Sequence, residues 1–315
     1  MECLLLAARL IAAVAAVVVS LLLIALFWLD ATAPNLWLDW PVPAAVPIGE
    51  TDIPGHDEAG GRVVTQVMFA GPGGAPIEAV LSRPSGNRAR LPVIILIGGF
   101  DSGLRIVGRV SDPGSNVVIG YGYPDAELLK ANGNPIRKLV MAQRSAHRVP
   151  GQIAALAGWA AMQPWADPRR VVLVGVSLGV VFAPASAQAM SAAGIPPAAT
   201  VLAYGGADLE MLVAANLRRV PPLWRTPVAW VVAVALRRLE PARYLPGLKG
   251  AVLVIHAVDD RFIPGPSAAL LDRLAPDTRT VVTSPGGHVV PDDPVVIATL
   301  NTVARQWLAH VGAAN

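Results

Sequence analysis

The chain has 315 residues, of which 54% are hydrophobic and only 15% are charged. A composition this apolar excludes an intrinsically disordered chain, and the length suits one large α/β domain or two small ones. The formal net charge is +3 and no long block of like charges occurs, so nothing indicates a nucleic-acid-binding surface. The single cysteine, Cys3, excludes an intrachain disulfide framework and a cysteine-based zinc site.

The N-terminus carries an almost unbroken apolar run over residues 10–29, with Ser20 as its one polar residue. Its length matches the roughly 20 residues that a helix needs to cross the hydrocarbon core of a bilayer. Arg9 precedes the run, and the positive-inside tendency puts the short N-terminus in the cytoplasm and everything after Asp30 on the far side. Residues 1–30 are therefore predicted to be a transmembrane anchor, with the remaining chain extracytoplasmic.

A cleaved secretory signal is the alternative for the same segment, and it would give a secreted protein. The best small-residue cleavage site, at residues 31–33, is followed by Pro34, which should hinder cleavage. Residues 31–61 are rich in proline and glycine and lack a periodic apolar pattern, so they are predicted to be an extended linker. The folded domain is then expected over residues 62–315.

The pattern of apolar segments in that domain predicts its fold class. Two strand-like segments around a Gly- and Pro-rich turn predict an antiparallel hairpin, at 63–69 and 77–81. Six short, continuous apolar runs follow, typical of parallel strands buried on both faces, and helix-length segments separate most of them. This alternation predicts an α/β fold with a mainly parallel central sheet and the hairpin at one edge. The predicted parallel strands are 93–97, 117–121, 171–174, 200–203, 252–255 and 280–283, and the predicted helices are 138–162, 177–193, 267–274 and 294–310.

One interval breaks this rhythm, because about forty residues at 205–248 separate two strands that a single helix would normally join. It contains an apolar run at 228–236 that is flanked by arginines and is too short to span a bilayer. A helical lid packed on the domain is the favoured interpretation. A surface that touches lipid is the alternative, and the two can coexist.

The strongest chemical signal is a Gly-x-Ser-x-Gly motif at residues 175–179, placed between an apolar strand and a helix-compatible segment. In this setting the motif resembles the nucleophile turn of α/β-hydrolase fold serine hydrolases, esterases and lipases among them. A strand-to-helix turn this tight needs small residues beside the nucleophile. The resemblance implies that Ser177 is the nucleophile and that its hydroxyl projects above the sheet at a helix N-terminus.

The same resemblance implies a Ser, Asp, His order along the chain for the catalytic triad. The segment 256–264 resembles the family's acid loop and places the acid at Asp260, with Asp259 as the alternative if the loop register differs. His288 follows the last predicted strand in a glycine-containing loop and is the expected general base. The other histidines are interpreted as packing, structural or surface residues, namely His56, His147, His256 and His310.

The tetrahedral intermediate of acyl transfer needs two N–H donors aimed at its oxyanion. The resemblance implies that the backbone of Leu178 supplies one and that Phe100, in the loop after strand 93–97, supplies the other. Gly98 stands where this family usually has a histidine, and Gly99 remains an alternative donor. Tyr121 and Tyr123 lie near the same edge of the predicted sheet without a predicted role.

The predicted function is hydrolysis of carboxylic esters, with lipophilic acyl groups favoured, through an acyl-enzyme formed on Ser177. The substrate is then a small-molecule or lipid-like ester, and neither a cofactor nor a metal is expected. An acyltransferase using the same triad is one alternative. A peptidase that holds a substrate amine with Asp208 and Glu210 is another, and a catalytically silent, membrane-attached binding module is the third.

Overall fold

A computed structural model describes residues 13, 17, 19–21, 23–39, 41–53, 61–86, 89–100, 103–290 and 293–315. Cys3, His56 and a large part of the predicted anchor lie outside these residues. Within the described part of the chain, none of the helices combines the length and the apolarity that a membrane crossing requires.

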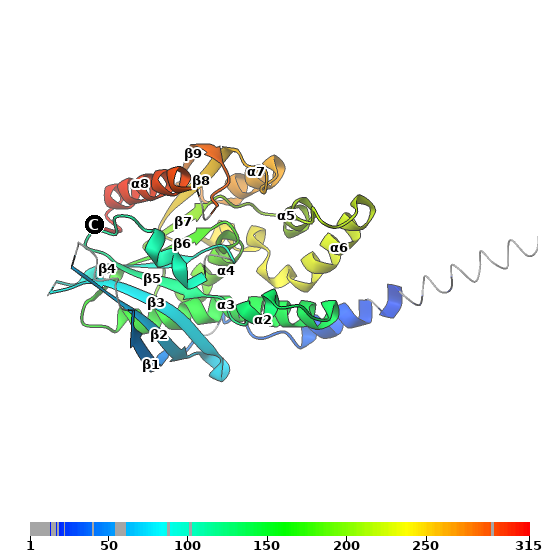
Figure 1. The fold of residues 1–315 in the computed structure, drawn as a ribbon, viewed down its shortest axis with the longest axis horizontal. Coiled ribbons are helices and arrows are strands. Elements are labelled where there is room, and N and C mark those ends of the chain that lie inside the picture. Colours follow the sequence, from blue (N-terminus) through cyan, green and yellow to red (C-terminus); the bar gives the residue numbers. More distant parts are fainter. Residues whose placement is uncertain are drawn as a thin grey trace, which may run out of the picture.

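A nine-stranded sheet forms the centre of the described structure, in the order β1-β2-β3-β5-β4-β6-β7-β8-β9 (Figure 1). The three pairs β1–β2, β2–β3 and β3–β5 are antiparallel. The five pairs β5–β4, β4–β6, β6–β7, β7–β8 and β8–β9 are parallel. The strands are β1 (Val46–Asp52), β2 (Arg62–Ala70), β3 (Pro76–Pro84), β4 (Leu91–Ile97), β5 (Val117–Gly122), β6 (Ala166–Val176), β7 (Ala199–Ala203), β8 (Ala251–Asp259) and β9 (Thr280–Gly287).

Helices cover both faces of this sheet, as its continuous apolar strands require. Successive residues of one strand therefore enter two different cores: Ile95 packs with α3 and α4, and Leu96 packs with α8 and η2. The α-helices are α2 (Ala126–Lys130), α3 (Pro135–Ala161), α4 (Gly179–Ala192), α5 (Leu209–Asn216), α6 (Pro222–Ala235), α7 (Gly265–Leu274) and α8 (Pro294–His310). The short 3₁₀ helices are η1 (Pro72–Gly74), η2 (Gly103–Arg109), η3 (Arg237–Leu239), η4 (Pro241–Arg243) and η5 (Leu245–Gly247).

The predicted α/β fold class is confirmed. The hairpin forms as β2 and β3, each of the six predicted parallel strands forms, and each of the four predicted helices forms with boundaries shifted by a few residues. The insertion at 205–248 folds as α5, α6 and the three 3₁₀ helices η3, η4 and η5.

One prediction needs correction, because the segment 31–61 is not a linker throughout. Residues Val46–Asp52 form β1, which pairs antiparallel with β2 and extends the sheet. All of its residues are exposed, so the sequence shows no apolar alternation there. The pairing shifts register between Pro47 and Gly49, and proline, which cannot donate to the ladder, is tolerated best in an edge strand such as this one.

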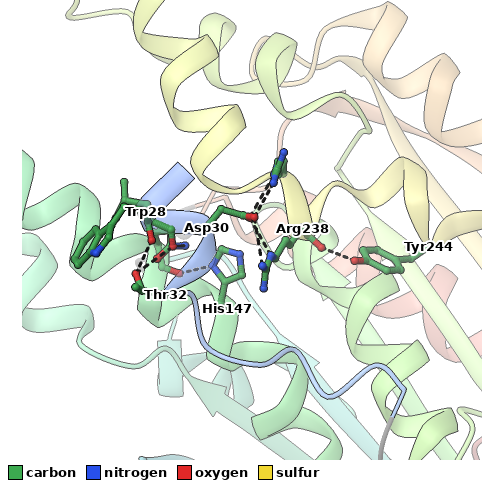
Figure 2. A network of polar contacts seen from close by, with 9 residues as sticks. Trp28, Asp30, Thr32, His147, Arg238 and Tyr244 are labelled. Atoms are coloured by element: carbon green, nitrogen blue, oxygen red, sulfur yellow. Dashed lines mark hydrogen bonds and ion pairs between the residues drawn. The ribbon is translucent and has the colours of Figure 1, made fainter. Parts of the chain in front are cut away.

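The N-terminal segment is fastened to the insertion by ion pairs. Residues 23–31 are helical, and this helix buries Leu29 against the domain. The Asp30 carboxylate accepts hydrogen bonds from Arg237 at 2.6 Å and from Arg238 at 2.9 Å (Figure 2). The two guanidinium groups, with Arg237 contributing most, lower the pKa of Asp30 to about 2 against the opposing effect of burial. We call this contact the Asp30 clamp.

Candidate active site

The candidate nucleophile lies on a sharp turn between β6 and α4. Ser177 has a φ of +57°, in the left-handed region that a serine adopts at some cost. Its N–H donates to the carbonyl of Ala203 at 2.9 Å, which ties the turn to the neighbouring strand β7. The turn holds the hydroxyl at the carboxyl end of the parallel strands, where the helix N-terminus favours negative charge.

The two glycines of the motif are required by space. A Cβ on Gly179 would lie 1.9 Å from the carbonyl oxygen of Ile97, and a Cβ on Gly175 would lie 2.8 Å from the carbonyl oxygen of Gly179. Both distances are far below contact distance, and both obstacles are backbone atoms. Glycine at both positions therefore lets the start of α4 pack closely against β4.

Three side chains predicted to act together form one hydrogen-bonded chain. Ser177 Oγ lies 2.7 Å from His288 Nε2, and His288 Nδ1 lies 2.7 Å from Asp260 Oδ2. The second oxygen of Asp260 accepts the backbone N–H groups of Phe262 at 2.8 Å and Ile263 at 3.0 Å. These bonds fix the carboxylate, which in turn holds the imidazole with its proton on Nδ1 and leaves Nε2 free to accept the serine proton.

The surroundings of the carboxylate favour its charged form. Burial raises the pKa of Asp260, but the hydrogen bond and charge of His288 and the two backbone donors outweigh burial, so the pKa lies below its ordinary value. The rings of Phe262 and Tyr204 flank His288, with centroids 4.9 Å and 6.0 Å from the imidazole. The His288 and Asp260 side chains are only 7% and 9% exposed, so water has little access to the bond between them.

The predicted oxyanion donors lie at the same place. Phe100 and Leu178 line one cavity together with Ser177 and His288, as does the alternative donor Gly99. Tyr123 has no predicted role, yet its hydroxyl donates to the carbonyl of Gly98 at 2.6 Å. This bond anchors the loop that follows β4.

The remaining candidate residues lie elsewhere. Asp259 is exposed at the end of β8, and His256 pairs with Asp272 at 2.8 Å, in keeping with the structural role expected for this histidine. His147 is buried within α3, and His310 is exposed at the end of α8. The side chain of Asp208 accepts the N–H of Met211 and so caps α5, and neither Asp208 nor Glu210 lines the cavity at Ser177.

The insertion contacts Phe262, whose ring packs against the imidazole of His288. Arg218 lies over the ring of Phe262 at 4.6 Å from its centroid and donates to the carbonyl of Arg261 at 2.6 Å. Asn216 donates to the carbonyl of Phe262 at 2.9 Å. Sequence reasoning did not find Phe262 as a site residue, although it lies between the predicted acid and the end of the same loop.

Comparison with solved structures places the fold among esterases. The acetyl xylan esterase from Paenibacillus sp. R4 aligns with a TM-score of 0.64 at 15% identity, over 93% of this chain and 94% of that one. Acetyl xylan esterase 1 from Thermoanaerobacterium sp. JW/SL YS485 aligns with a TM-score of 0.60 at 16% identity, over 87% and 97%. A thermostable esterase from Pseudomonas putida ECU1011 aligns with a TM-score of 0.54 at 18% identity, over 81% and 85%.

No family model matches the chain, and no curated protein matches it by sequence. At identities of 15% to 18%, the similarity to these solved structures shows the fold alone. The chain has an α/β fold with a mostly parallel central sheet, and it shares that fold with esterases.

Proposed function

We propose that this protein is a serine hydrolase that cleaves carboxylic esters through an acyl-enzyme. The observation that carries the proposal is the continuous chain from Ser177 Oγ through His288 to Asp260, with both links at 2.7 Å. A serine hydroxyl is a weak nucleophile unless an adjacent base accepts its proton, and this arrangement supplies such a base and its orienting carboxylate.

The reaction has two halves that use the same groups. In the first, Ser177 Oγ attacks the ester carbonyl carbon while His288 Nε2 takes the hydroxyl proton, and the N–H groups of Leu178 and Phe100 stabilise the oxyanion. His288 then gives that proton to the departing alkoxide, so that an alcohol leaves and the acyl group stays on the serine. In the second half, water attacks the acyl-enzyme with His288 again as the base, which releases the carboxylic acid and restores Ser177.

Membrane attachment is a second part of the proposal. The apolar run at 10–29 has the composition of an anchor, and the large side chains of Phe27 and Trp28 are 73% and 53% exposed. In the insertion, Trp224 is 60% exposed beside Arg225, a combination that suits the headgroup region of a bilayer. Full-length protein that stays in the membrane fraction after carbonate extraction would support attachment. Release into the soluble fraction with a new N-terminus near Pro34 would instead indicate a cleaved signal.

The decisive test is a Ser177→Ala variant assayed on p-nitrophenyl esters from acetate to palmitate. We expect kcat/KM to fall by a factor on the order of 10³ or more, because the acyl-enzyme can no longer form. Ser191→Ala is a matched control, because the Ser191 hydroxyl bonds to the carbonyl of Ala187 within α4, away from the reacting atoms. Labelling by a fluorophosphonate should follow the same pattern. Equal activity in wild type and Ser177→Ala would exclude the proposed mechanism.

Product analysis distinguishes hydrolysis from acyl transfer, since both reactions proceed through the same acyl-enzyme. Release of free acid in the presence of an acceptor alcohol supports hydrolysis. A new ester as the main product would instead show an acyltransferase.

A further inference from the structure

The helix layer on one face of the sheet is thin next to the candidate active site. Parallel strands such as β4 and β5 are usually joined by an α-helical crossover. Here the connection contains the seven-residue 3₁₀ helix η2 instead, while α8 covers the other part of the same face. A short 3₁₀ helix covers less of the sheet than an α-helix does. One sign is Ile94, which is half-buried while every other residue of the central strand β4 is buried.

A cavity of about 330 Å³ occupies the space between η2 and α8. Ser177 and His288 lie in its wall, its floor is the sheet surface at Ile94 and Val174, and its sides include Val110 and Leu300. Its lining is aliphatic over most of its extent. The cavity does not involve the insertion at 205–248, so it is separate from the space beneath the expected lid.

Two independent measures give the length of this cavity. Its floor extends from Ser177 to Ile94, which pairs in register with Val172, and five residues of strand correspond to about 16 Å. Its wall on α8 extends from Ile297 to Leu308, and eleven residues of helix also correspond to about 16 Å. The cavity is therefore a channel along the sheet, directed from the carboxyl ends of the strands toward their amino ends.

Polar groups end the channel on the side away from Ser177. Asn116, just before β5, exchanges two hydrogen bonds of 2.9 Å with the backbone of Asn315. Asp112 forms an ion pair with Arg305 in the same region. Arg109 and Asn301 also line the cavity, and the Asn301 amide donates to the Arg109 carbonyl at 2.7 Å. An aliphatic group that enters at Ser177 thus meets mostly apolar walls before it reaches the polar groups near Asn116.

We propose that this channel binds the acyl chain of the ester substrate and limits that chain to about ten carbons. The proposal rests on the esterase function proposed above, since the acyl carbon must be bonded to Ser177 Oγ at the channel mouth. An apolar cavity of about 150 Å³ accommodates one benzene molecule. A cavity of about 330 Å³ therefore has room for roughly a dozen carbon atoms, which agrees with its length.

The dependence of kcat/KM on acyl length is the first measurement. Burial of each methylene should raise kcat/KM by roughly fourfold, from acetate up to about the decanoate ester. Beyond that length kcat/KM should level off or fall, because further carbons reach the polar end near Asn116. A maximum at acetate, with a steady fall for longer chains, would overturn the proposal.

A blocking variant tests the location of the chain. Ala304 lines the channel about halfway along α8, and Ala304→Phe places a ring in the path of the acyl chain. The ratio of kcat/KM for decanoate to that for acetate should fall roughly 60-fold if three methylenes are displaced. Ala298→Phe is the matched control, because Ala298 is exposed on the same helix and outside the channel lining, and its ratio should stay within twofold of wild type. An unchanged ratio in folded Ala304→Phe would exclude this channel, and Ala304→Leu is the milder variant if Ala304→Phe does not fold.

Binding to an inactive variant separates failure of the channel from failure of the proposed function. Decanoate, kept below its micelle concentration, should bind Ser177→Ala, and the double variant Ser177→Ala, Ala304→Phe should bind it at least tenfold more weakly. Decanoate binding without any ester hydrolysis by wild type would support the channel and refute the esterase. If wild type hydrolyses esters but Ala304→Phe changes neither the ratio of kcat/KM values nor decanoate binding, the esterase function would be supported and the channel refuted.

Discussion

At the scale of single residues, two adjacent carboxylates make a matched pair. Asp260 contacts His288 Nδ1 at 2.7 Å, whereas Asp259 is exposed. We expect Asp260→Asn to reduce kcat by a factor on the order of 10⁴, because an amide cannot stabilise the imidazolium and favours the wrong tautomer. Asp259→Asn should stay within twofold of wild type. Steady-state kinetics on one ester at pH 8 would check both variants. A larger loss of kcat in Asp259→Asn than in Asp260→Asn would identify Asp259 as the carboxylate that orients His288.

The residues that the sequence could identify share one property, namely a local pattern. Ser177 lies in a five-residue motif after an apolar strand, and Asp260 and His288 each follow a strand in the order that the motif implies. Tyr123 and Phe262 act through contacts with Gly98 and His288 that join separate segments. Those contacts depend on how loops from different strands pack together, which cannot be predicted from periodicity or spacing in the sequence.

At the scale of elements, burial explains which ones the sequence could predict. Strand β4 and the buried residues 252–255 of β8 are continuously apolar because helices cover both faces, and each strand was predicted within a few residues. The edge strand β1 is exposed throughout and contains Pro47 and Gly49, so its sequence is typical of a linker. The short helix η2 has no apolar periodicity over enough turns to be recognised, although its brevity creates the channel beside it.

The Asp30 clamp gives a prediction for two elements that are 207 residues apart in sequence. Asp30→Asn keeps the shape of the side chain and removes its charge, so the helix at 23–31 should separate from η3 more often. Ion pairs that remain accessible to solvent contribute roughly 0.2–1 kcal/mol, which corresponds to about a 1.4- to fivefold rise in amide hydrogen exchange over both segments. Hydrogen exchange with mass spectrometry would measure it.

The clamp should also depend on pH in a defined direction. The pKa of Asp30 is lowered to about 2, so its contribution is complete above the ordinary value of 3.8 and is lost as the pH falls through about 2. The difference between wild type and Asp30→Asn should therefore persist from pH 7 to about pH 4 and vanish near pH 2. Asp39→Asn, at an exposed carboxylate nearby, is the control. Equal exchange in all three proteins at pH 7 would show that the ion pairs do not hold the helix.

At the scale of the whole molecule, the two faces of the sheet have different roles. On one face α3 and α4 pack densely on the sheet, and α4 fixes the turn at Ser177. On the other face η2 and α8 leave the channel that begins at the same serine. The N-terminal segment and the insertion then meet through the Asp30 clamp. Neither the channel nor the clamp could be predicted from the sequence, since both arise between elements that are distant along the chain.

The buried histidine of α3 predicts how the stability of the whole fold changes with pH. His147 is fully buried, and Nδ1 contacts the carbonyl of Gln143 at 2.6 Å, so the proton of the neutral ring lies on Nδ1. Within the described part of the chain, Nε2 has no hydrogen-bond partner. Protonation there would place a charge in a buried environment, and burial accordingly lowers the pKa of His147 below 6.5.

A lowered histidine pKa fixes the sign of the effect. Below the ordinary pKa of 6.5, His147 binds a proton in the unfolded chain but not in the folded protein. The free energy of unfolding therefore falls as the pH falls, until the pH reaches the pKa of His147 in the folded protein. The slope should approach about 1.4 kcal/mol per pH unit in that window. His147→Phe should remove this slope just below pH 6.5, while His310→Phe, at an exposed histidine, should leave it unchanged. Urea unfolding at half-unit pH steps would measure the three profiles, and a wild-type profile that is flat below pH 6.5 would show that His147 accepts its proton without cost in the folded protein.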